Sequence, residues 1–197
     1  MRLNNLLEQK KAAITKEWFD IIINSYPSDT AYFLKKQKDH FANPVGTTIL
    51  HSLKPLFDEI LNGMDHKSIV SYLDPMIRIR AVQVMFSPSQ AVAFIFSLKE
   101  AVRNNLKKRE IEDDQIINEL IMFESKIDEV GLMAFDIFMK CREQVYELKA
   151  NGERNRVFRA FQRAGLVYEI PDGKRPGVMN VLKSSNTAVE PLDDRVD

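Results

Sequence analysis

The sequence predicts an all-α fold, a single helical bundle domain that ends in a long C-terminal helix. Only 7 of its 197 residues are glycine, and no segment combines sustained apolar–polar alternation with hairpin turns, as β-strands would. Apolar residues recur instead at helical spacing, between residues that favour helix caps. A chain of this length is large enough for one domain with its own core, followed by a tail.

Turn and cap residues divide the first third of the chain into helices. The first is expected over about residues 3–25, before Tyr26-Pro27, and a short helix over about 28–38. Asn43 is expected to cap the next helix, which begins at Pro44 and ends near residue 61.

Three further caps follow. Asp65 is expected to cap a short helix that ends before Asp74, and Asp74 a second helix whose first residue is Pro75. Ser87 is expected to cap a long helix over residues 88–108.

The last long helix is predicted over residues 114–149, because its apolar residues alternate spacings of four and three. This heptad seam is formed by Ile116, Leu120, Phe123, Ile127, Val130, Ala134, Ile137, Cys141, Val145 and Leu148. A second stripe contains Ile117, Ile121, Leu132, Phe135, Met139 and Tyr146. Two apolar faces suit either a helix buried on both sides of a monomer or a dimer, and we expect a homodimer. The expected interface is the far end of the seam, at Ile137, Cys141, Val145 and Leu148.

The composition changes after residue 150. We expect a helical domain over residues 1–150, a short basic helix over 151–170 and a flexible tail over 171–197. The basic helix carries Arg154, Arg156, Arg159 and Arg163. An ordered tail docked through Val178, Met179 and Leu182 is the alternative.

Charge and cysteine content exclude several classes of protein. The 28 Lys and Arg residues balance 28 Asp and Glu residues, which argues against nucleic-acid binding and electrostatic membrane anchoring. The single cysteine, Cys141, allows no intramolecular disulfide and fits a reducing compartment. The N-terminus lacks a signal-peptide core, and the longest apolar run, residues 91–96, is too short for membrane insertion. We expect a cytoplasmic protein.

No catalytic or metal-binding constellation is recognisable. His40, His51 and His66 have no i, i+3 or i+4 spacing, and the 88–108 segment offers no axial histidine for haem. Nucleophile elbow, P-loop and dinucleotide-binding motifs are absent from the sequence. Glu124 and Asp128 lie one helical turn apart, which suits a solvated face better than a cation site or a core ion pair. We expect no enzyme activity, no metal and no cofactor.

The best candidate site is polar and lies among apolar residues. Arg78 and Arg80 point to nearly opposite sides of a helix that is apolar all round, so at least one should be buried and need a partner. The candidate residues are Arg78, Arg80, Gln83, Ser87, Ser89 and Gln90. Their polar groups suit either of two roles. They could hold loop carbonyls and helix ends in place, the structural role that we favour, or they could bind a carboxylate or phosphate ligand.

Several phrases of the sequence resemble one family. KKAAITKEWFDIIINSYP, FLKKQKDHFANPVG and IRIRAVQVMFSPSQAVAFIF, with the long helix that follows, are similar to the N-terminal domain of RsbRD-type RsbT co-antagonist proteins. The resemblance covers about residues 1–150. It implies a globin-like, dimeric sensor domain that binds no haem and serves as a signal input in the bacterial stress response. Only 47 residues follow Ala150, too few for the STAS domain of about a hundred residues that completes those proteins.

Two functions follow from these observations. The first is a stand-alone signal-input or regulatory domain in a bacterial stress or redox and energy-metabolism response, acting through a homodimer and an unidentified protein partner. The alternative is a non-catalytic protein that binds a small anionic or apolar metabolite near Arg78 or Arg80.

Overall fold

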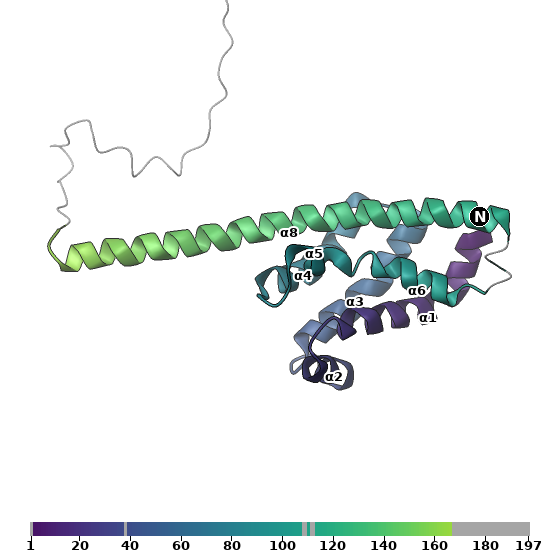
Figure 1. Cartoon of the computed structure of the whole chain (residues 1–197), viewed down its shortest axis with the longest axis horizontal. Coiled ribbons are helices and arrows are strands. Elements are labelled where there is room, and N and C mark those ends of the chain that lie inside the picture. Colours follow the sequence, from purple (N-terminus) through teal and green to yellow (C-terminus); the bar gives the residue numbers. More distant parts are fainter. Residues whose placement is uncertain (1, 38, 108–109, 111–112, 167–197) are drawn as a thin grey trace, which may run out of the picture. The chain divides into compact units, whose positions relative to one another are not determined.

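The computed structural model describes residues 2–37, 39–107, 110 and 113–166, and it confirms the all-α fold (Figure 1). No strand occurs within these ranges. The chain divides into two compact units, residues 1–148 and 149–197. The helices are α1 (Arg2–Asn24), α2 (Ser28–Lys36), α3 (Pro44–Asp58), the π-helical turn η1 (Glu59–Gly63), α4 (His66–Val82), α5 (Pro88–Ala93), α6 (Ser97–Asn105) and α8 (Asp114–Arg163).

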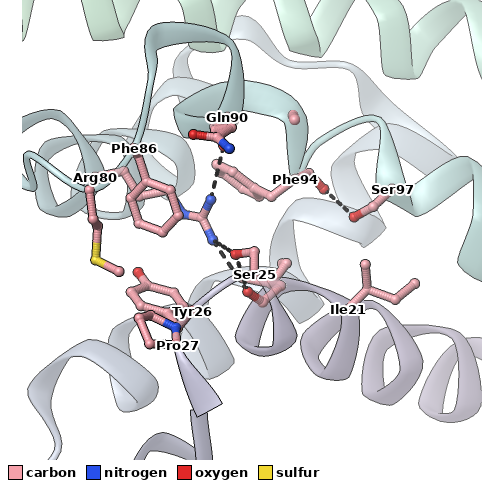
Figure 2. Close-up of a pocket in the computed structure, with 12 residues that line it drawn as sticks. Ile21, Ser25, Tyr26, Pro27, Arg80, Phe86, Gln90, Phe94 and Ser97 are labelled. Atoms are coloured by element: carbon pink, nitrogen blue, oxygen red, sulfur yellow. Dashed lines mark hydrogen bonds between the residues drawn. The ribbon is translucent and has the colours of Figure 1, made fainter. Parts of the chain in front are cut away.

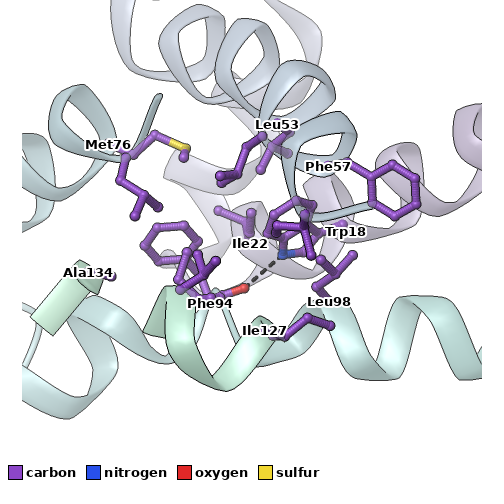
Figure 3. Close-up of a cluster of buried hydrophobic side chains, with 14 of the residues drawn as sticks. Trp18, Ile22, Leu53, Phe57, Met76, Phe94, Leu98, Ile127 and Ala134 are labelled. Carbon is purple, nitrogen blue, oxygen red and sulfur yellow. Dashed lines mark hydrogen bonds between the residues drawn. The ribbon is translucent and has the colours of Figure 1, made fainter. Parts of the chain in front are cut away.

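The core of the first unit forms around α1, which packs against α3 and α6. Trp18 is fully buried, and its indole N–H donates a 2.7 Å hydrogen bond to the carbonyl of Phe94 (Figure 3). Leu53, Phe57 and Leu98 surround it in the same cluster. Burial of these large side chains supplies most of the stabilisation of such a bundle.

The predicted cap at Asn43 is confirmed. Its side-chain oxygen accepts the amide of Gly46, while its amide nitrogen donates to the carbonyls of Leu34 and Gln37. Asn43 therefore joins the end of α2 to the start of α3. A side chain at Gly46 would overlap the Asn43 amide, with its Cβ 2.5 Å from Nδ2, so the close turn requires glycine here.

The predicted break at Asp74-Pro75 is wrong, because α4 continues through Pro75. Asp65 caps the whole helix by accepting the Ser68 amide, and Asp74 instead pairs with Arg78. The buried positions run in helical register across the proline: Ile69, Leu73, Met76, Ile77, Arg80 and Ala81. Packing of this face outweighs the roughly 3 kcal/mol that an interior proline costs.

The prediction of one long helix over residues 88–108 is also wrong, because this segment is divided into α5 and α6. The interruption occurs at Phe94, whose carbonyl accepts the Trp18 indole and the Ser97 hydroxyl, each at 2.7 Å. Side chains therefore satisfy a carbonyl that would otherwise bond within a continuous helix.

Helix α8 is longer than predicted and continues through Gly152 to Arg163, so no separate basic helix begins at residue 151. One interior glycine costs a helix about 1 kcal/mol, too little to end it without a proline or cap. Residues 149–163 are exposed in their own unit. The expected tail over 171–197 lies outside the described residues.

The heptad seam of α8 faces the core of the first unit. Phe123 packs edge-on against Phe57, and the Glu119 carboxylate accepts the backbone amide of Leu3 at 2.8 Å. Ile137 and Cys141 are buried within the unit, Val145 is half-buried and Leu148 is 72% exposed. Two of the four residues expected at a dimer interface are therefore covered by the chain itself.

Candidate functional site: the Arg80 pocket

A pocket of about 660 Å³ lies where the end of α1, helix α4 and helix α5 converge (Figure 2). Most of its wall is apolar or aromatic, and Arg80 is the only charged side chain among the described residues that line it. The lining residues are Ile21, Ile22, Ser25, Tyr26, Pro27, Arg80, Met85, Phe86, Gln90, Ala93, Phe94 and Ser97. This volume lies in the range typical of small-molecule sites.

Arg80 is only 2% exposed and bonds to neutral oxygens. Its guanidinium donates to the Ser25 hydroxyl at 2.9 Å, to the Gln90 carbonyl at 3.2 Å and to the Ile22 carbonyl at 3.4 Å. No Asp or Glu within the described ranges forms an ion pair with it. The expectation that at least one of the two arginines is buried and needs a partner is confirmed for Arg80, whose partners include two carbonyl oxygens.

Three aromatic rings surround the guanidinium. Its carbon lies 4.5 Å from the Phe86 ring centre, 4.9 Å from that of Phe94 and 5.3 Å from that of Tyr26 (Figure 2). Cation–π attraction offsets part of the cost of removing the cation from water. Burial nevertheless lowers the pKa of the Arg80 guanidinium, the direction expected for a cation without an opposite charge beside it.

Two polar atoms beside Arg80 also lack a hydrogen bond. The Tyr26 hydroxyl and the Gln83 side-chain oxygen are buried without a partner among the residues that the structure describes. Burial raises the pKa of the Tyr26 hydroxyl despite the opposing effect of Arg80, so this group stays protonated and can donate a hydrogen bond. Buried polar groups normally have partners, and these two atoms lie near each other and near Arg80, so they add a polar donor and acceptor beside the guanidinium.

Of the six site residues predicted from the sequence, some line the pocket and the others lie outside it. Arg80 and Gln90 line the pocket, Gln90 through its backbone carbonyl, while Gln83 places a buried oxygen beside Tyr26. Arg78 is exposed and pairs with Asp74 at 2.6 Å.

Ser87 and Ser89 serve a different purpose at the start of α5. The Ser87 hydroxyl and the Gln90 side chain form a reciprocal capping box, and Ser89 bonds to Ser87. These side chains therefore start α5 and do not line the pocket.

Sequence reasoning missed four pocket residues: Ser25 and Tyr26 after α1, and Phe86 and Phe94 beside the predicted residues. Tyr26 was noted only as the end of the first helix. A buried arginine needs polar and aromatic neighbours, but only the fold shows that the end of α1 provides them.

The acidic residues considered as a cation site have surface partners. Glu124 forms a two-pronged ion pair with Arg103, and Asp128 pairs with Lys99 at 2.6 Å. His40, His51 and His66 are exposed. Within the described residues, no three His, Cys, Asp or Glu side chains gather as metal ligands would, and no helix is long and apolar enough to cross a membrane. Cys141 is buried, which raises the pKa of its thiol.

A second feature lies on the solvent side of α8. Four large apolar side chains follow one face of the helix and form what we call the α8 stripe: Leu132, Phe135, Met139 and Tyr146. Leu132, Met139 and Tyr146 are seven residues apart, so they repeat at the heptad spacing of helix pairs. Leu132 is 67% and Tyr146 57% exposed.

Comparisons with known proteins identify one family. Residues 12–151 match the family described as the RsbT co-antagonist protein rsbRD N-terminal domain. An uncharacterised protein of Archaeoglobus fulgidus is 21% identical over 145 residues, which is 73% of this chain and 83% of that protein. No solved structure gives a significant match, so the globin-like character expected from the resemblance stays a prediction.

Proposed function

The chain belongs to the family of RsbT co-antagonist rsbRD N-terminal domains, and we propose that it acts as a signal-input domain through protein–protein contacts. The family is one of regulatory domains in stress signalling. More specifically, the chain forms a homodimer and binds a further regulatory protein in the cytoplasm. The observation that carries it is the α8 stripe.

The α8 stripe has the properties of a contact surface. Monomeric proteins rarely keep a continuous row of large apolar side chains in water, and aromatic residues and methionine are enriched at interfaces. The stripe contains Phe135, Met139 and Tyr146, and its seven-residue repeat suits a partner helix that lies along α8.

The stripe differs from the interface expected from the sequence, of which Leu148 remains exposed. Ile137 and Cys141 pack into the unit's own core, so they are not available to a second chain. Positions 132, 135, 139 and 146 lie on another face of the same helix and stay exposed. A dimer formed here would need no unfolding of the core, because each of the four side chains is already exposed by 40% or more.

Light scattering on three proteins tests this proposal. We expect a wild-type dimer and a folded monomer for the Leu132→Glu, Met139→Glu double variant, because two carboxylates would be buried at the contact. The matched control, Lys140→Glu with Gln144→Glu, adds two carboxylates to exposed positions of α8 outside the stripe and should stay dimeric. A monomeric wild type, or a double variant that remains dimeric, would refute the α8 contact.

A further inference from the structure

We propose that the Arg80 pocket binds a small monocarboxylate with an apolar body, whose carboxylate lies on the Arg80 guanidinium. This inference goes beyond the contacts proposed for α8 and does not depend on them. It rests on the charge, the unsatisfied polar atoms and the apolar wall of the pocket.

The charge of the pocket calls for one anion. A buried cation costs several kcal/mol unless an opposite charge lies beside it, and Arg80 has none among the described residues. A guanidinium carries five N–H donors, and three are engaged here, which leaves two. These are the Nε–H and one Nη1–H, which lie on different edges of the guanidinium, so a carboxylate oxygen can accept one charge-assisted hydrogen bond from Arg80.

The ligand should carry a single charge. Arg80 is the only Lys, Arg or His in the pocket wall, so a phosphate dianion or a dicarboxylate would bring a second charge without a partner. The buried Tyr26 hydroxyl lies beside Arg80 and makes no hydrogen bond among the described residues, so it can donate to the same carboxylate.

The remainder of the wall fits an apolar body. Phe86 and Phe94 flank the guanidinium, and Ile21 continues the apolar surface along α1 (Figure 2). The rim residues Pro27 and Ala93 are exposed, whereas Arg80 lies at the buried floor. A ligand can therefore enter with its carboxylate first and leave its apolar body against the aromatic rings.

Calorimetric titration with octanoate, 1-octanol and inorganic phosphate tests the ligand class. Octanoate and octanol share the apolar chain and differ in charge. We expect octanoate to bind at least about tenfold more tightly than octanol, the effect of one charge-assisted hydrogen bond, and phosphate not to compete. Equal affinities for octanoate and octanol, no octanoate binding up to about 1 mM, or displacement by phosphate would each overturn the proposal.

Variants of the full chain test the location. Arg80→Met should lower octanoate affinity at least about tenfold and remove the preference over octanol, while Arg78→Met, an exposed arginine of the same helix, should bind like wild type. Ala93→Trp fills the mouth of the pocket from an exposed position and should weaken both ligands, which keeps the test decisive if Arg80→Met does not fold. Unchanged binding by Ala93→Trp would overturn the proposed site. The Leu132→Glu, Met139→Glu variant should bind octanoate like wild type, which separates this result from that on α8.

Discussion

Arg78 and Arg80 are two positions apart on α4 and have opposite surroundings. Arg78 points to solvent and pairs with Asp74 within its own helix, whereas Arg80 is buried among three aromatic rings and neutral oxygens. A surface ion pair contributes little to stability, so the outer arginine is replaceable. The inner arginine joins α1, α4 and α5 and also leaves donors available in a pocket. The same residue type therefore joins three helices and lines a pocket only where the fold buries it.

The two glycines of α8 show the same contrast. Gly131 lies in the first unit, where an added Cβ would overlap the Phe96 ring, while nothing lies within 4 Å of such a Cβ at Gly152. One glycine permits close packing, and the other is a helical residue without a packing role. Sequence shows the residue type, and the neighbours decide its importance.

We expect the largest difference in stability between substitutions at two apolar positions of α8. Ile137→Glu buries a carboxylate in the core and should reduce the free energy of unfolding by on the order of 4 kcal/mol. Leu132→Glu, on the exposed stripe, should change it by less than about 0.5 kcal/mol. Urea unfolding of both variants at a concentration where each is monomeric measures the difference, and similar losses would refute the assignment of core and surface.

Substitutions of the two glycines should change stability less, and in opposite directions from each other. Gly131→Ala overpacks the contact with Phe96 and should destabilise the first unit by about 1–3 kcal/mol. Gly152→Ala should instead favour the helix by about 0.5–1 kcal/mol, since alanine is the better helix former. Thermal unfolding followed by circular dichroism checks both. A neutral Gly131→Ala would show that Phe96 moves aside freely.

Substitutions of the two arginines should differ still less in their effect on the free energy of unfolding. Arg80→Met removes three hydrogen bonds and the cation–π contacts but also removes an unbalanced buried charge, so the net loss should be about 1–2 kcal/mol. Arg78→Met should cost less than about 0.5 kcal/mol. If Arg80→Met lowered the free energy of unfolding in urea by more than about 4 kcal/mol, Arg80 would be held in a buried ion pair with an acidic residue.

Acid should weaken the contact between α1 and α8. The hydrogen bond from the Leu3 amide holds the pKa of Glu119 below its usual range. Its stabilising contribution is therefore complete above the unfolded pKa, near about 4, and is lost as the pH falls through the lower folded value. Glu119→Gln should flatten the decline of stability between about pH 5 and pH 2, measured by urea unfolding across that range.

Local sequence signals predicted the fold class and several caps correctly. Asn43, Asp65 and Ser87 act on their own neighbours, so spacing alone identifies them. The breaks at Asp74-Pro75 and near Lys149 were wrong, because core packing carries α4 through Pro75 and one glycine is too weak to end α8. The division between α5 and α6 depends on Trp18, about 76 residues away in sequence, and no local pattern reveals it.

The candidate site was predicted only in part for a similar reason. Periodicity indicated that Arg78 or Arg80 would be buried but not which one, because the helix is apolar all round. Tyr26 reaches the guanidinium from the turn after α1, and Phe94 from the turn between α5 and α6. The heptad seam was recognised correctly, but spacing alone does not distinguish a face that meets the chain's own core from one that meets a partner.

Two methionines of α8 provide the most direct test of the contact surface. Met139 belongs to the α8 stripe and is 40% exposed, while Met122 lies outside the stripe and is 60% exposed. Peroxide oxidation followed by mass spectrometry reports the accessibility of each sulfur as protein concentration rises. We predict that Met139 becomes progressively protected while Met122 continues to react at the same rate. Equal oxidation of Met139 at every concentration, from a chain that scatters light as a 22.8 kDa monomer, would contradict the account.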